Sequence, residues 1–435
     1  MIAGKMKRGL VAGAAAMLVS APAFAQGDAP LMVDRGDTAF ILICSALVLF
    51  MTLPGLALFY GGLVRAKNFL SVLMHCFAIA ALVSLIWALG GYSLAFGTGN
   101  AWIGDFSRFG LANLHEPRQG MSIPENAFAL YQMMFAVITP ALIVGAFPER
   151  VKFGWLILFS ALWLLVVYIP VAHWVWGGGW MAGRGVLDFA GGIVVHTTAG
   201  ISALVVALMI GSRRGFPNTL IPPHSSALTM VGAGMLWVGW FGFNGGSALG
   251  ADVHAGDALL STHLAAATAA LMWAALERAK IGKATSIGLV TGAVAGLATV
   301  TPMAGYIAPL GGVIAGAAGA AVCFVAVLFV KQKWRVDDSL DVFAVHGIGG
   351  MLGSLLLAPL AAAAFGGTSP HEGYTIGGQF MAQAIGVGVT LVWSGVATFV
   401  LAKLANLFIP MRVDAEAEHD GLDLHSHGER AYEFD

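Results

Sequence analysis

Charged side chains are scarce in this sequence. Asp, Glu, Lys and Arg make up only 10% of its 435 residues, whereas 58% of the residues are hydrophobic. A soluble domain carries about 25% charged residues, and its core has no room for this much apolar surface. The composition therefore excludes a soluble domain and indicates a membrane protein. The formal net charge of −1 gives no sign of nucleic-acid binding.

Cysteine is also rare, with three residues in the whole chain. Cys44, Cys76 and Cys323 each lie inside an apolar run. Their spacing matches neither a disulfide framework nor a zinc site. We expect all three to be buried as small apolar side chains.

The first 25 residues form a separate segment. Lys5, Lys7 and Arg8 make a basic start, a short apolar run follows, and Ala23-Phe24-Ala25 is a small-x-small cleavage site. These features are typical of a secretory signal peptide. The alternative, a first membrane helix, is disfavoured because the run is too short to span a bilayer. We expect residues 1–25 to be cleaved, which leaves the mature N-terminus outside the cytoplasm.

Long apolar runs follow one another along the rest of the chain, and most approach the ~20 residues that span a bilayer. They do not alternate apolar and polar residues, which excludes a β-barrel. The sequence predicts an all-α polytopic membrane protein with about 11 transmembrane helices. The runs are Thr38–Tyr60, Phe69–Phe96, Ala127–Phe147, Gly154–Val171, Gly191–Ile210, Ala227–Gly246, Ala258–Leu276, Ser286–Val300, Tyr306–Val330, Val342–Ala364 and Phe380–Phe408.

The loops differ strongly in positive charge, and short loops rich in Lys and Arg stay in the cytoplasm. With the N-terminus outside, one set of loops carries only Arg35, Arg108, Arg118 and Arg184. The other set is predicted to be cytoplasmic, together with the C-terminus. Its basic residues are Arg65, Lys67, Arg150, Lys152, Arg213, Arg214, Arg278, Lys280, Lys283, Lys331, Lys333 and Arg335.

His196 and His346 occupy matching places among the predicted helices. When the helices are divided into five, five and one, each histidine lies on the fifth helix of its half. Matching positions in halves of odd helix number indicate an inverted repeat, with a shared site near the middle of the membrane. We therefore predict a 5+5 inverted repeat plus one helix.

Both histidines follow an acid and lie among glycines, in Asp188-Phe-Ala-Gly-Gly-Ile-Val-Val-His196 and in Asp341-Val-Phe-Ala-Val-His346-Gly-Ile-Gly-Gly. An ionisable group inside a membrane is costly and marks a candidate functional site. Three interpretations are open: hydrogen bonds that join helices, axial ligands of a haem, or a narrow transport path lined by imidazoles that donate and accept protons. The glycines favour tight helix packing, which argues against a haem pocket.

Asp188 and the outer aromatic residues each permit two interpretations. Asp188 binds a cation directly, or it caps the fifth helix by accepting hydrogen bonds from free amides. Tyr131 and Phe135 share one face of the third helix, and Trp176 is placed in an outward segment after the fourth. These aromatic residues, like the motif Trp240-Phe-Gly-Phe243-Asn-Gly-Gly-Ser247 that ends the sixth helix, serve as membrane-surface anchors or as a cation–π cage.

The composition changes after Pro410, where Asp and Glu dominate and three histidines occur. We divide the chain into the signal peptide, a membrane domain over residues 26–412 and a cytoplasmic acidic tail over residues 413–435. The plain interpretation of the tail is a solvated acidic end. Nothing in it defines the geometry of a metal site.

In combination, these motifs resemble the ammonium transporter family (Amt/Mep/Rh), in its bacterial Amt branch. The two histidine motifs look like family blocks, and further blocks follow in the family's order over essentially the whole mature chain. These are Gly145-Ala-Phe-Pro-Glu-Arg150, Trp176-Gly-Gly-Gly, Gly239-Trp-Phe-Gly-Phe-Asn244, Val300-Thr-Pro302, Asp337-Asp338 and Gly421-Leu-Asp-Leu-His-Ser-His-Gly-Glu-Arg-Ala-Tyr432.

The resemblance implies an ammonium transporter or channel rather than an enzyme. It implies a homotrimer in the bacterial inner membrane, with one pore in each subunit and no cofactor. It also gives roles to residues along one path. From outside inward these are the recruitment residues Trp176, Tyr131 and Ser247 with Asp188 in support, the gate Phe135 and Phe243, and the pore histidines His196 and His346.

Tyr131 departs from the family pattern, in which a phenylalanine is common at this place. The ring is kept, and we expect the added hydroxyl to alter affinity or a water contact. Ammonium resembles potassium in size and charge, but only ammonium can release a proton. A dry apolar pore opposes any intact cation. We therefore expect electrogenic uptake in which ammonia passes the histidines and the proton travels separately.

The resemblance also implies a PII signalling protein as a partner at the cytoplasmic face, and methylammonium as a second substrate. Three alternatives stay open at this point. They are an ammonium sensor or transceptor on the same fold, an electroneutral channel for ammonia or carbon dioxide, and a redox protein that carries haem.

Overall fold

The structure, a computed structural model, describes residues 32–219 and 221–432. Within these ranges it contains no β-strand, and 11 helices are long and apolar enough to cross a membrane. The predicted all-α fold with 11 spans is therefore confirmed. The predicted signal peptide, residues 1–25, lies outside the described residues.

Several spans extend further than the apolar runs, because helices continue through polar and glycine-containing turns. The largest difference is in the fourth span, predicted to end at Val171, which continues to Gly183. Trp176 is consequently the last residue of helix α7 (Ile169–Trp176) and does not lie in an outward loop. The observed spans are Arg35–Leu63, Ala66–Phe96, Glu125–Ala146, Phe153–Gly183, Gly192–Ile210, Ser226–Ala248, Val253–Ile281, Ser286–Met303, Pro309–Trp334, Phe343–Leu360 and Ile376–Phe408.

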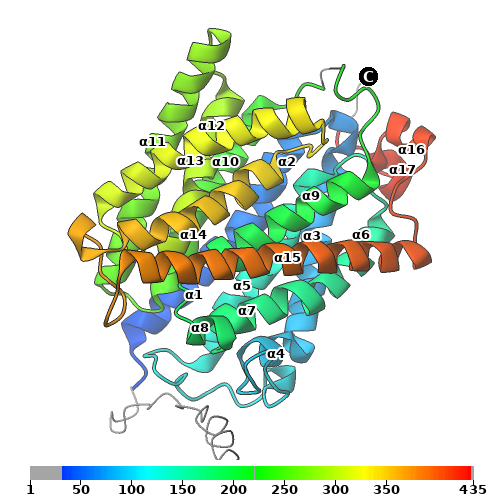
Figure 1. Cartoon of the computed structure of the whole chain (residues 1–435). Helices are drawn as coiled ribbons and strands as arrows, with labels where there is room; N and C mark the ends of the chain where they lie inside the picture. The colour runs from blue at the N-terminus through cyan, green and yellow to red at the C-terminus, as the bar shows by residue number, and fades with distance from the viewer. Residues whose placement is uncertain (1–31, 220, 433–435) are drawn as a thin grey trace, which may run out of the picture.

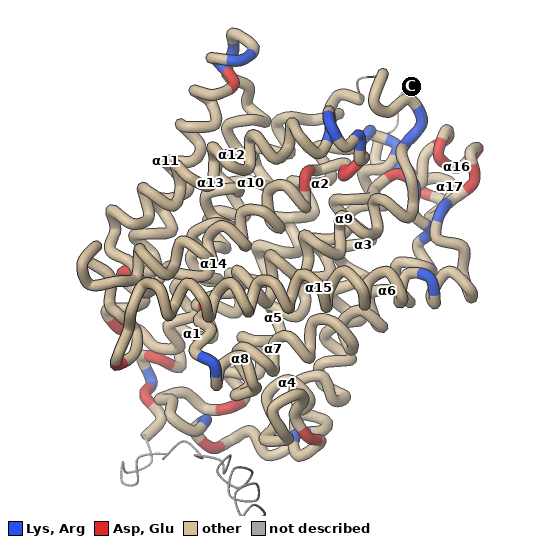
Figure 2. Tube along the Cα trace, in the orientation of Figure 1, with Lys and Arg blue, Asp and Glu red and all other residues tan. Residues whose placement is uncertain are grey.

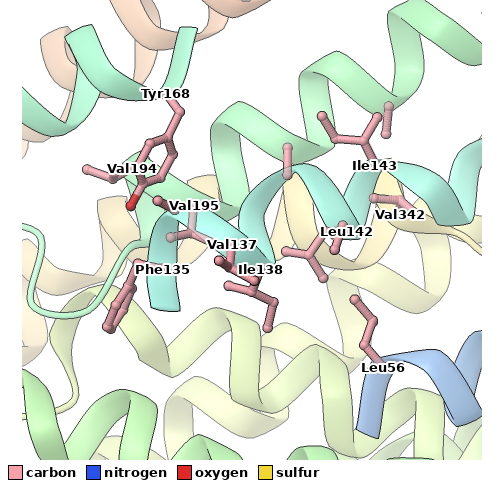
Figure 3. Close-up of a cluster of buried hydrophobic side chains, with 14 of the residues drawn as sticks. Leu56, Phe135, Val137, Ile138, Leu142, Ile143, Tyr168, Val194, Val195 and Val342 are labelled. Carbon is pink, nitrogen blue, oxygen red and sulfur yellow. The ribbon is translucent and has the colours of Figure 1, made fainter. Parts of the chain in front are cut away.

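Helix α5 (Glu125–Ile143) is buried on nearly all sides and packs against α1 (Arg35–Phe50), α3 (Phe69–Ile86) and α9 (Thr198–Ile210). Figure 3 shows its apolar side chains within the central cluster of the bundle, close to Val195. An apolar helix of a membrane protein can face either lipid or protein, and 89% of an 18-residue stretch in the span that contains α5 is buried inside the protein. α5 therefore occupies the inside of the bundle, whereas the long helix α15 (Ile376–Phe408) runs along the outside in Figure 1.

The two histidine-bearing spans cross each other. The fifth span joins the π-helical turn η7 (Gly192–Thr197) to α9, and the tenth joins η12 (Phe343–Gly347) to α14 (Ile348–Leu360). α14 packs on η7, and α9 packs on η12. This reciprocal packing of two similar units is the relation expected between halves of an inverted repeat.

Charged residues gather at the two ends of the bundle, and the helices between them are nearly free of charge (Figure 2). Lys and Arg concentrate at the end that holds the C-terminus, around helices α16 (Ala415–Asp420) and α17 (Leu422–His427). α1 begins at the opposite end (Figure 1). This distribution agrees with the predicted cytoplasmic position of the C-terminus, which remains a prediction.

The acidic tail is folded onto the basic end of the bundle. Glu418 accepts hydrogen bonds from the backbone N–H of Arg214 at 2.9 Å and from the Arg412 guanidinium at 2.7 Å. Asp423 accepts the backbone N–H groups of Leu70 and Ser71, at 3.0 and 2.7 Å, in the first turn of α3. Glu418 and Asp423 therefore satisfy free amides and a cation at the basic end, whereas Asp414, Glu416 and Asp420 are exposed, as expected of a solvated acidic end.

Candidate functional site

Two cavities enter the bundle from opposite ends. The outer cavity, about 620 Å³, lies at the end where α5 begins, and Phe135, Trp176 and Ser247 are among its lining residues. The inner cavity, about 630 Å³, lies at the basic end, and its lining includes Arg213 and His346. No residue lines both cavities. The side chains between them therefore decide what passes.

Two stacked phenylalanine rings close the floor of the outer cavity. The ring centroids of Phe135 and Phe243 are 4.3 Å apart, with 36° between the ring planes. The Trp176 indole meets the Phe135 ring edge-on at 5.7 Å. Phe135 is 1% exposed and Phe243 is fully buried. The predicted gate residues are thus brought together and are both buried.

The two histidines lie directly behind the phenylalanine pair. The His196 ring stacks at 6.1 Å from the Phe243 ring and at 5.2 Å from the His346 ring. The Nδ1 atoms of the two histidines are 3.3 Å apart. A hydrogen bond between these nitrogens needs one N–H donor and one bare acceptor. The pair therefore shares a single Nδ1 proton, and the nitrogens that contact each other leave no space for a haem iron between them.

The histidine pair also reaches the second cavity. His346 lines the inner cavity, whereas His196 Nε2 is buried without a hydrogen-bond partner among the described residues. Phe243, His196 and His346 each lie in a π-helical turn, respectively η8 (Phe241–Gly245), η7 and η12. Such turns are rare and often occur at functional sites. The spatial order is outer cavity, two phenylalanines, two histidines and inner cavity.

Asp188 caps the helical segment that carries His196. One carboxylate oxygen accepts the N–H groups of Gly191 and Gly192, at 2.9 and 2.7 Å. The other accepts those of Ile193 and Val194, at 2.8 and 3.0 Å. Burial raises the pKa of Asp188 to about 6, although these four amides favour the ionised form. The capping interpretation therefore fits the structure, since both oxygens are occupied by backbone.

Asp338 occupies the corresponding place in the second half. It accepts the backbone N–H groups of Val342 and Phe343, at 3.1 and 2.8 Å. Burial, together with the neighbouring Asp341, raises the pKa of Asp338 to about 7. Like Asp188 in the first half, this carboxylate begins a π-helical turn that carries a histidine.

Asp341 is the acid that precedes His346 in the sequence motif, but the structure places Asp338 at the start of the helical turn instead. Asp341 forms an ion pair with Lys331 at 2.8 Å instead of capping the helix. The signal that identifies Asp338 was present in the sequence. Asp338 precedes His346 by the same interval that separates Asp188 from His196.

Tyr131 is fully buried and does not line the outer cavity. Its hydroxyl lies 2.7 Å from the carbonyl oxygen of Phe243 and 3.3 Å from the hydroxyl of Ser247. Ser247 in turn donates to the Phe243 carbonyl at 2.9 Å. The added hydroxyl of Tyr131 thus holds the end of the sixth span. A direct contact between Tyr131 and a substrate remains a prediction.

Trp240 packs against both histidines, a position that the sequence motif did not single out. Its ring lies 5.6 Å from that of His196 and 6.5 Å from that of His346, parallel to the latter within 2°. Its indole N–H donates to the Thr301 hydroxyl at 2.9 Å, which holds the ring in place. Trp240 precedes Phe243 by three residues, and this spacing puts both side chains on one helix face. The spacing alone could therefore have placed Trp240 beside the gate.

Comparisons with known proteins support this arrangement. The model of the Ammonium Transporter Family matches residues 39–432. The ammonium transporter of Bacillus subtilis (strain 168) is 45% identical, over 92% of this chain and 99% of the relative. Ammonium transporter Amt1 of Archaeoglobus fulgidus is 42% identical, over 92% of this chain and 100% of the relative.

Solved structures give the same result. Mep2 of Saccharomyces cerevisiae has a TM-score of 0.81 and 37% identity, over 88% of this chain and 90% of that chain. A protein described as Sensor Amt Protein has a TM-score of 0.84 and 28% identity, over 90% of this chain and 98% of that chain. The family match spans nearly all described residues, and this chain therefore belongs to the Ammonium Transporter Family, whose members are multi-pass membrane transporters and not enzymes.

Proposed function

We propose that this protein carries ammonium across the bacterial cytoplasmic membrane. Ammonium is recruited in the outer cavity, loses its proton near the phenylalanine pair and passes His196 and His346 as ammonia. The proton follows separately along the histidines, so transport moves charge. The observation that carries this proposal is the hydrogen-bonded histidine pair between two cavities, behind a closed aromatic gate.

The outer cavity offers the chemistry that a small cation needs. Trp176 and Phe135 supply aromatic rings, whose faces attract cations. The Ser247 hydroxyl already donates to a backbone carbonyl, so its oxygen is left to accept an N–H from ammonium. The capping carboxylate of Asp188 lines the same cavity and adds negative charge without needing direct contact.

The path behind the gate favours ammonia over intact cations. Phe243, Trp240 and the two histidines are buried, and an unpaired cation among them would lose its hydration without compensation. Potassium has no way to avoid this cost. Ammonium avoids the cost of dehydration by releasing a proton. Because the two imidazoles share an Nδ1 proton, the pair can take up one proton while it gives up another.

Further parts of the proposal rest on the family resemblance. We propose a cleaved signal peptide over residues 1–25, a membrane domain over 26–412, a regulatory tail over 413–435 and assembly as a homotrimer. The docked tail lies at the same basic end as the inner cavity. This position supports a cytoplasmic partner of the PII class, since such a partner would contact the cavity mouth and the tail together.

The test is the current produced by purified protein in liposomes after a jump in ammonium concentration. We expect a saturable current that potassium neither evokes nor blocks. We expect the double variant His196→Ala with His346→Ala to lose potassium exclusion or the ammonium current, because the proton then lacks its relay. If this variant keeps both properties unchanged, the histidine role is wrong. Ammonia flux without current indicates an electroneutral gas channel, and silence in both measurements indicates a sensor.

A further inference from the structure

Gln132 is a buried polar residue in the outer cavity that the site described above does not use. It belongs to α5, is 7% exposed and lines the outer cavity. Its carboxamide oxygen is buried and has no hydrogen-bond partner. Buried polar groups in proteins are nearly always bonded, and an exception calls for an absent water, ion or ligand.

The place of Gln132 on the helix puts it beside the gate. Phe128 and Phe135, four residues before and three residues after it, also line the outer cavity. Residues at these spacings share one helix face. Gln132 therefore lies about one turn, roughly 5 Å, outward of the ring that closes the cavity floor.

The other buried polar side chains of this helix form hydrogen bonds, which makes Gln132 an exception among them. Glu125 accepts hydrogen bonds from Tyr92 and two arginines, and the Tyr131 hydroxyl contacts two carbonyl oxygens and Ser247. A half-turn about χ3 exchanges the oxygen and nitrogen of a glutamine carboxamide within the same outline. In the structure the oxygen is the buried atom of this carboxamide, so a half-turn directs the oxygen to the cavity and moves the amide nitrogen to the buried position.

We propose that Gln132 is a further substrate-positioning residue, whose carboxamide oxygen accepts an N–H hydrogen bond from ammonium in the outer cavity. This inference deepens the proposed function and rests on it. Asp188 cannot serve as this acceptor, because four backbone amides occupy its two oxygens. Gln132 and Ser247 together would hold ammonium from two directions, immediately outward of Phe135.

The inference also concerns selectivity. Ammonium presents an N–H donor in each of its four tetrahedral directions, whereas a methyl group occupies one of these directions in methylammonium. An acceptor at a fixed position is therefore met by ammonium in every orientation and by methylammonium in fewer. Removal of the Gln132 acceptor should weaken the binding of ammonium more than the binding of methylammonium. A residue that only supports the fold would affect both substrates alike.

The experiment measures ammonium-evoked current in liposomes against ammonium concentration, with methylammonium in parallel. Gln132→Met and Gln132→Leu remove the acceptor with two different shapes, and Gln132→Glu keeps it. Gln379→Met is the matched control. Gln379 is also buried, at 3% exposure, but its amide donates to Gly185 and Gln383, and it does not line the cavity.

We expect both apolar variants to raise the half-saturating ammonium concentration about tenfold or more, as for loss of one hydrogen bond to a charged group. The maximal current should change less than twofold, and the preference for ammonium over methylammonium should fall. Gln132→Glu and Gln379→Met should leave the half-saturating concentration at or below the wild-type value.

Three results would overturn the inference. They are an unchanged half-saturating concentration in the apolar variants, an equal rise in Gln132→Glu, or a parallel loss for both substrates. If the apolar variants do not fold, a raised half-saturating concentration in Gln132→Glu alone still contradicts it, and an unraised one supports it. Failure of the proposed function is distinguishable, because the wild-type protein would then give no ammonium current.

Discussion

At the residue scale, function in this protein depends on which polar atoms are already occupied. The carboxylate of Asp188 accepts hydrogen bonds from four backbone amides, and the Ser247 hydroxyl donates its proton to a backbone carbonyl. One shared proton joins the histidine nitrogens that face each other. What remains available to a substrate is a small set of acceptors and aromatic faces, which suits a cation that donates hydrogen bonds.

Asp188→Asn is expected to damage both stability and transport. An asparagine offers one oxygen, so two of the four backbone N–H groups would face an amide group that cannot accept them. Buried donors left without a partner cost about 1–3 kcal/mol. We expect a lower melting temperature in detergent and reduced ammonium uptake.

The control is Asp34→Asn. Asp34 is an exposed N-cap of α1 that accepts the N–H of Asp37 at 2.9 Å, and asparagine caps helices about as well as aspartate. Equal melting temperatures for wild type and Asp188→Asn would contradict the capping role.

At the element scale, the site depends on the crossing of two interrupted helices. A Cβ added to Gly200 would lie 2.2 Å from the Cα of Gly347, and one added to Gly350 would lie 2.6 Å from the Cβ of His196. Small residues therefore set the helix separation that lets the two imidazoles meet. The π-helical turns on each side direct the histidines into the space between the cavities.

Gly200→Ala is expected to push the two histidine helices apart. Overpacking a tight contact of this kind costs about 1–3 kcal/mol. The displacement should also separate the imidazoles, so ammonium current should fall more than stability alone explains. Thermal melting and liposome current check both effects.

Gly388→Ala in α15 is the matched control, because a Cβ at that position meets nothing within 4 Å. Alanine there should leave current unchanged and stability equal or slightly higher, since alanine favours helix more than glycine does. Similar losses of current and stability in the two variants would show that close packing at the helix crossing is not required for transport.

At the scale of the whole molecule, the tail connects segments that are far apart in sequence. Asp423 lies at the first turn of α3, and Glu418 bridges the loop after α9 to Arg412. The backbone N–H of Leu422 also donates to the Asn68 side chain at 2.8 Å. These contacts hold the tail beside the mouth of the inner cavity.

Asp423→Ala is expected to loosen the tail without unfolding the membrane domain. It removes an acceptor from two N–H groups of α3, a loss of about 0.5–2 kcal/mol for a helix cap. We expect faster proteolytic cleavage between residues 408 and 432. Asp420→Ala, at a side chain that is 57% exposed, should not change the cleavage rate. Equal cleavage in both variants would argue against docking through Asp423.

Much of the fold and site was predictable from single residues and their spacing. The two histidines, the phenylalanine pair and Trp176 are where the motifs and the family resemblance led us to expect a path. Asp338 and Trp240 were missed, although repeated spacing in the first case and helical spacing in the second pointed to them. Tyr131 was expected at the recruitment site, but the structure buries it behind Ser247.

The sequence alone was sufficient for the class of protein and the number of spans, because a dry bilayer admits only continuous apolar helices of sufficient length. Only the tertiary structure decided which carboxylate caps which helix, that the tail docks, and that Gln132 is left without a partner. These features depend on contacts between segments distant in the chain. Neither composition nor periodicity contains information about which distant atoms meet.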